Sequence, residues 1–135
     1  MTAPARPNRP QRSLHVPNVG HKAPIPLGAR VGNLICSSGI IGKDPDTGAL
    51  PADAATQAAH AFTNLRALLA AGGASLDDVV RLSVSVKDDS VRDAVNVHWL
   101  AAFPDPDDRP ARHISVHDLQ HGMWLQIEVL ALVQN

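Results

Sequence analysis

An arginine two residues after a proline opens an alternating segment near the C-terminal end of the chain, in the run Arg109-Pro110-Ala111-Arg112. Proline ends the preceding loop, and the residues as far as His117 alternate in the manner of a strand. A guanidinium presents paired N–H donors that match the two oxygens of a carboxylate. Arg112 could therefore hold a small organic acid, and the alternative is an ordinary surface salt bridge.

The histidines are further candidates for chemistry near neutral pH. His113 directly follows Arg112 and shares its strand parity with His117, and either imidazole could act as an acid or a base. For each of them the alternative is a surface or hydrogen-bonded histidine. His117 and His121 are four residues apart, a spacing that brings two metal ligands together only on a helix. Because they flank a strand end and a turn, the sequence predicts no metal site.

Composition places the chain among globular proteins and limits its partners. A length of 135 residues suits one domain with a modest core. Hydrophobic residues make up 44% and aromatic residues only 3%, so the core must be built from aliphatic side chains. The formal net charge of -1 argues against nucleic acid as a partner, because phosphate binding relies on excess positive charge.

A single cysteine, Cys36, excludes an internal disulfide, and its apolar neighbours predict a small buried side chain. No apolar run reaches the length of a membrane-spanning helix, and no signal-peptide core is present. We therefore expect a cytoplasmic protein that makes no contact with membranes. No cofactor is expected.

Periodicity and turn residues predict one domain over residues 13–135, behind a flexible tail at residues 1–12 that is rich in proline and arginine. The expected elements are strands at 14–16 and 29–38, a helix at 53–71 with Asp53 as N-cap, a strand at 79–87, a helix at 91–102, and strands at 112–118 and 123–133. This order predicts an α+β fold in which two helices pack on one face of a single sheet.

The last strand is apolar on both sides, with Leu125, Ile127 and Val129 on one face and Leu130 and Leu132 on the other. A strand of this kind is covered on both faces. Since two helices cover only one face, the other should meet a partner subunit. The alternative is a sheet that curls over itself.

Several pieces of sequence share their residues and spacing with one known family. They are Val31-Gly32-Asn33-Leu34-Ile35 with Ser38-Gly39, Asp46-Thr47-Gly48, Asn64-Leu65, the segment 71–80, Ala94-Val95-Asn96, Pro110-Ala111-Arg112 and Ile127-Glu128. In this order the chain resembles the RidA/YjgF family of imine and enamine deaminases over residues 20–133. The resemblance implies a chorismate-mutase-like trimeric barrel, with ligand pockets between subunits.

The resemblance also assigns roles to single residues. Arg112 falls on the arginine that holds the substrate carboxylate, and Ser38 and Gly39 fall on a pocket edge. Asn96 falls near the same pocket, and Ile25 and Ile114 fall on further substrate-binding positions. Asn96 could instead fix its helix to a loop, and Ser38 could be a satisfied strand hydroxyl.

Three departures from the family's pattern bear on catalysis. Ile25 stands where an aromatic hydroxyl is common, and Ile40 replaces a glutamine. Gln126 replaces the carboxylate that positions the attacking water. Glutamine can orient water but cannot accept its proton near neutral pH. Arg112 and Gln126 remain the residues to which we assign catalysis.

Two functions follow from these residues. The first is a deaminase that hydrolyses a small carboxylate-bearing imine or enamine, 2-aminoacrylate-like or aminomuconate-like, to the keto acid and ammonia. The second is a non-catalytic trimeric module that binds a small carboxylate or regulates a partner. Ribonuclease activity, attached to some relatives, has little support in a chain so poor in aromatic residues.

Overall fold

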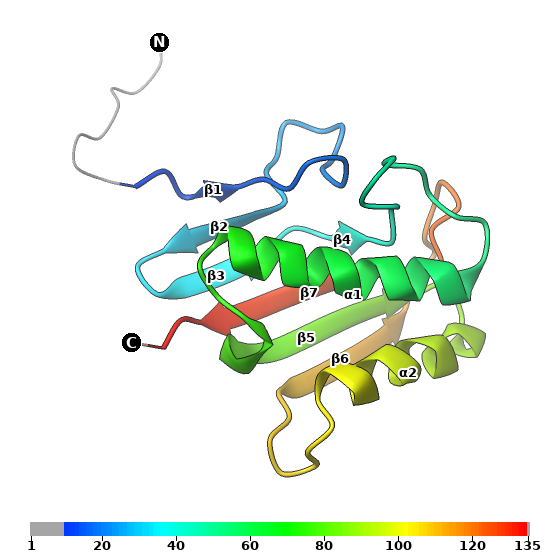
Figure 1. Cartoon of the computed structure of the whole chain (residues 1–135). Helices are drawn as coiled ribbons and strands as arrows, with labels where there is room; N and C mark the ends of the chain where they lie inside the picture. The colour runs from blue at the N-terminus through cyan, green and yellow to red at the C-terminus, as the bar shows by residue number, and fades with distance from the viewer. Residues whose placement is uncertain (1–9, 135) are drawn as a thin grey trace.

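One mixed sheet carries two helices on the same face (Figure 1). The structure is a computed structural model that describes residues 10–134. The strands are β1 (Ser13–Leu14), β2 (Gly28–Val31), β3 (Leu34–Ser37), β4 (Ile40–Ile41), β5 (Val79–Val86), β6 (Ala111–Val116) and β7 (Leu125–Leu132). The helices are α1 (Ala54–Ala71) and α2 (Arg92–Ala102). The predicted α+β class with a single sheet and two helices is confirmed.

Local signals set the ends of α1. Asp53 is the N-cap, and its carboxylate accepts a hydrogen bond of 2.8 Å from the backbone N–H of Thr56. The helix ends at Gly72, and Gly73 follows with φ +78°, a left-handed conformation that glycine adopts without strain. Both predicted ends are therefore confirmed.

Helix α2 begins one residue later than predicted. A 3-10 turn, Asp89–Val91, precedes it, and the Asp88 carboxylate accepts a hydrogen bond of 2.8 Å from the N–H of Ser90. The side chains of Val95 and Trp99 are buried beneath the helix. Arg109 then donates to the carbonyl oxygen of Phe103 at 2.9 Å, which ties down the loop between α2 and β6.

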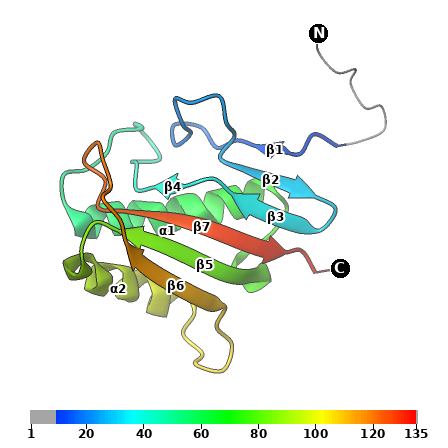
Figure 2. The ribbon, with the colours of Figure 1, turned by 180° about the vertical axis from the view of Figure 1, so that it is seen from behind.

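The sheet has the strand order β1-β2-β3-β7-β5-β6, with β4 paired to β7 (Figure 2). All pairs are antiparallel except β5 with β6, which α2 joins by a crossover connection. The sequence did not predict β4, because its two residues are too short to show a period. Residues Ile40–Ile41 nevertheless pair with Ile127 and Gln126.

Alternation in β5 differs from the prediction at its first residues. Simple alternation along the predicted strand 79–87 would place Val80 on the same face as Leu82, but Val80 is 48% exposed while Val79 is buried. A β-bulge between Val79 and Arg81 inserts one extra residue opposite β7. Such a bulge shifts the parity of the residues that precede it.

The two faces of the sheet differ in cover. Beneath the helices, the buried side chains of β5 pair across the sheet with those of β7, as in Leu82 with Val129 and Val84 with Ile127. The opposite face carries an open apolar patch, made of Val31, Leu34, Cys36, Leu130 and Leu132. The expectation that Cys36 is buried is wrong for the single chain. Its neighbour Ile35 takes the core position, so alternation turns Cys36 outward.

The predicted tail at residues 1–12 falls largely outside the described residues, which begin at residue 10. Arg12 already lies beside the sheet, since its carbonyl oxygen accepts a hydrogen bond of 2.8 Å from the N–H of Arg30. Within residues 10–134, neither helix combines the length and the hydropathy needed to cross a bilayer.

Candidate active site

Arg112 is held from two directions. Its Nη1 donates a hydrogen bond of 2.7 Å to Oδ1 of Asn96. Its Cζ lies 4.8 Å from the centroid of the Trp99 ring, within the range of a cation–π contact. The guanidinium is therefore not a free surface charge, and among residues 10–134 it forms no salt bridge of the ordinary kind considered above. Asn96 fixes the arginine itself and not a neighbouring loop.

This arrangement follows from strand register and helix periodicity. Arg112 pairs with the buried Leu82 of β5, so its side chain lies on the face that the helices cover. Strand β6 forms the edge of the sheet, which leaves the side chain only half-buried. Asn96 and Trp99 are three residues apart on α2 and thus share one helix face.

The surroundings of Arg112 disfavour its positive charge. Burial lowers the pKa of Arg112, and the positive charge of Arg92 lowers the pKa further. The guanidinium nonetheless stays a cation, because arginine is not deprotonated in proteins. Within residues 10–134, Nε and Nη2 have no hydrogen-bond partner, and neither atom is sealed from solvent. These two donors form one edge of the guanidinium that can receive a carboxylate.

Gln126 and Gly39 meet elsewhere. A Cβ atom on Gly39 would lie only 2.9 Å from Oε1 of Gln126, so the amide fits because residue 39 has no side chain. Ser38 precedes this glycine, and its N–H donates to the carbonyl oxygen of Leu27 at 2.8 Å. Ile25 lies on the adjoining loop and is 47% exposed.

The predicted site residues thus form two groups. The arginine half consists of Arg112, Asn96 and Ile114 on the helix-covered side of β6 and on α2. The glutamine half consists of Gln126, Gly39 and Ser38, and Ile25 lies two residues before Leu27, whose carbonyl oxygen accepts the hydrogen bond from Ser38.

The two halves do not meet within one chain. Gln126 pairs with Ser85, which alternates with the buried Val84 and Val86, and so it lies on the open face of the sheet. Strand β5 separates β7 from β6, which places the two backbones about 10 Å apart across the sheet. A ligand in contact with both Arg112 and Gln126 would need residues from a second copy of the chain.

The histidine candidates do not join the arginine half. His113 pairs with Ser83 and points to the face opposite Arg112. The Nε2 atom of His117 lies 2.9 Å from Oγ of Ser115. Among the described residues, no group of three His, Cys, Asp or Glu side chains has the geometry to hold a metal ion.

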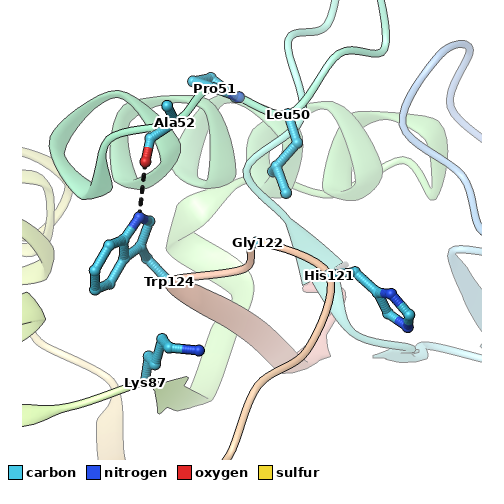
Figure 3. A pocket seen from close by; sticks show the side chains of 7 residues that line it. All are labelled: Leu50, Pro51, Ala52, Lys87, His121, Gly122 and Trp124. Carbon is cyan, nitrogen blue, oxygen red and sulfur yellow. Dashed lines mark hydrogen bonds between the residues drawn. The ribbon is translucent and has the colours of Figure 1, made fainter.

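A hollow of about 390 Å³ lies between the loop before α1 and the loop before β7 (Figure 3). It is lined by Leu50, Pro51, Ala52, Lys87, His121, Gly122 and Trp124. Its polar groups are partly engaged, since Nζ of Lys87 donates to the carbonyl oxygen of Leu119 and Nε1 of Trp124 donates to that of Ala52. It contains none of the predicted site residues.

Comparison with known proteins identifies the family of the chain. The family model described as Endoribonuclease L-PSP matches residues 25–133. The chain belongs to the RidA/YjgF family. A relative from Escherichia coli K12, the 2-iminobutanoate/2-iminopropanoate deaminase, is 35% identical over 111 residues, which span 81% of this chain and 87% of the relative.

Solved structures of RidA/YjgF proteins have the same fold. The YjgF gene product of Escherichia coli superposes with a TM-score of 0.81 at 31% identity, over 91% of this chain and 99% of that protein. RidA from an Antarctic Psychrobacter gives 0.82 at 29% identity, over 91% of this chain and 100% of that one. The family resemblance inferred from the sequence is confirmed.

Sequence reasoning missed one contributor to the site. Trp99 was not among the predicted site residues, although its ring lies against the Arg112 guanidinium. Its position three residues after Asn96 was the available signal, because residues with that spacing share one helix face.

Proposed function

We propose that this RidA/YjgF chain is an imine and enamine deaminase that acts on a small carboxylate-bearing substrate. The observation that carries the proposal is the open Nε–Nη2 edge of Arg112, beside an Nη1 already bound by Asn96. A fixed guanidinium edge pairs with a carboxylate through two parallel hydrogen bonds. The Escherichia coli relative named as a 2-iminobutanoate/2-iminopropanoate deaminase supports the same substrate class.

Hydrolysis of the imine needs only a bound substrate and a correctly oriented water molecule. An enamine first takes a proton on carbon to become an iminium, whose C=N carbon is electrophilic. Water adds to that carbon and loses a proton, and ammonia then leaves to give the keto acid. Gln126 can orient the water through its amide but cannot accept the proton, which passes to solvent or to the departing nitrogen. Proximity of water and bound acid supplies the acceleration.

The complete site is proposed to form between protomers of a homotrimer. The arginine half of one chain would face the glutamine half of the next, and the open apolar patch would line the centre of a barrel. Two facts support this arrangement: the halves are separated within one chain, and Leu34 and Leu132 are 46% and 45% exposed on the uncovered face.

Ammonia release from freshly generated 2-iminobutanoate tests the function. An amino acid oxidase supplies the imino acid in the presence of catalase, and semicarbazide captures whatever remains unhydrolysed. The protein should accelerate the loss of imine above the buffer rate, and the Arg112→Ala variant should not. Equal rates with wild type and with buffer would refute the proposal.

A second function is supported by Gln126, which cannot act as the general base. The chain would then bind a small carboxylate without turnover, as a trimeric regulatory module. Gln126→Glu separates the two functions. A large gain of deaminase activity over an inactive wild type would favour the binding module, whereas an already active wild type would exclude it.

A further inference from the structure

The ring of Trp99 lies against the guanidinium of Arg112, with 4.8 Å between Cζ and the ring centroid. Trp99 is itself fixed, since it is only 8% exposed and packs against Phe103 with 4.8 Å between their ring centroids. A rigid aromatic surface therefore restricts the plane of the guanidinium. Asn96, bound to Nη1 at 2.7 Å, restricts its rotation within that plane.

These two restraints leave one edge of the guanidinium for a ligand. Nη1 is occupied and Cζ lies over the ring of Trp99, while Nε and Nη2 have no partner within residues 10–134. A carboxylate that approaches this edge must lie in the plane of the guanidinium to accept two hydrogen bonds.

We propose that Trp99 is a positioning residue, which orients Arg112 so that its Nε–Nη2 edge binds the substrate carboxylate side-on. The inference rests on the proposed function and deepens it. In a 2-imino acid the reacting carbon is bonded directly to the carboxylate carbon, about 1.5 Å away. A fixed guanidinium plane therefore fixes the reacting carbon, which favours substrates whose imine is adjacent to the carboxylate.

Truncation of the ring tests this role through both binding and turnover. Trp99→Leu keeps an apolar side chain but removes the aromatic ring that contacts the cation. Trp99→Phe keeps an aromatic ring, although a smaller one. We expect Trp99→Leu to weaken 2-oxobutanoate binding, measured by calorimetry, by about tenfold and to lower kcat, with Trp99→Phe within about threefold of wild type. The matched control is Phe62→Leu, a buried aromatic residue on α1 that pairs with His98 and not with Arg112.

A purely structural role for Trp99 predicts a different result. Both leucine variants would then lose thermal stability, while their keto acid affinity after correction for the folded fraction would equal that of wild type. That result would overturn the inference. If wild type itself binds no keto acid and releases no ammonia, the proposed function fails instead, so the two failures are distinguishable.

A spectroscopic measurement remains informative if Trp99→Leu does not fold. The chain has two tryptophans, so Trp124→Phe leaves Trp99 as the single fluorophore beside Arg112. Saturating 2-oxobutanoate should change the Trp99 emission, and adding Arg112→Lys should abolish that change. Unchanged emission at a concentration where calorimetry records binding would contradict the inference.

Discussion

Arg112 and Gln126 lie on opposite faces of one sheet, with β5 between the strands that carry them. Arg112 is beneath α2, where Asn96 accepts its hydrogen bond, while Gln126 faces the uncovered side next to Gly39. Both residues were assigned to one pocket, and the register of the sheet separates them within a chain. This separation supports the proposal that the site is shared between chains.

Subunit mixing tests whether the site is shared. Arg112→Ala inactivates the arginine half, and Gly39→Val inactivates the glutamine half because its side chain would collide with the Gln126 amide. Each variant alone should be inactive. Co-refolded at equal amounts, they should regain roughly a quarter of wild-type deaminase activity, the share of sites that pair two intact halves in a ring with head-to-tail interfaces.

The control for subunit mixing is a double variant that carries both changes in one chain, mixed with either single variant. No pair of intact halves can form in that mixture, so activity should stay at the buffer rate. Equal recovery in the control and the test mixtures would mean that the site does not span two chains.

A lysine at position 112 should damage the site almost as much as an alanine. One ammonium cannot reproduce the paired contact, and it also lacks the planar guanidinium whose Cζ lies over the Trp99 ring. We expect Arg112→Lys and Arg112→Ala each to lower kcat/KM by about 100-fold or more, close to the buffer rate, since each of the two hydrogen bonds in the paired contact contributes about 1.5–3 kcal/mol. Wild-type kcat/KM in the lysine variant would exclude the paired contact.

Charge on the open apolar patch should dissociate the oligomer. Leu132→Glu places a carboxylate where a partner sheet would pack, so light scattering should report a lower mass than wild type. Val97→Glu is the matched control, because Val97 is 64% exposed on α2, away from the open face. A wild-type protein that is already monomeric, or a Leu132→Glu variant with unchanged mass, would contradict the proposed trimer.

His98 should make the fold less stable in mild acid. Burial lowers the pKa of His98 below its usual 6.5, and the charge of Arg66 lowers the pKa further. The unfolded chain then binds the proton more readily, so this stabilisation is complete above the unfolded pKa and is lost as the pH falls below it. Between about pH 7.5 and about pH 5, urea unfolding should show a smaller stability loss for His98→Gln than for wild type.

Much of the fold could be predicted because its signals are local. Asp53 caps α1 through a residue three positions away, and Gly72 with Gly73 ends it within one turn. Where the prediction was wrong, the cause lay outside the local pattern. The bulge that exposes Val80 and the pairing that creates β4 both depend on β7, which lies about 50 residues after the bulge and more than 80 residues after β4.

By itself, the sequence determined the family and the ends of α1, and it singled out Arg112 as the candidate to bind an acid, because residue types and short spacings carry that information. Only the tertiary structure decided where that arginine points and what holds it. Strand alternation separates two sets of side chains but does not say which set the helices cover. That choice depends on contacts between distant segments, and here it places Arg112 against Trp99 and Gln126 on the other face.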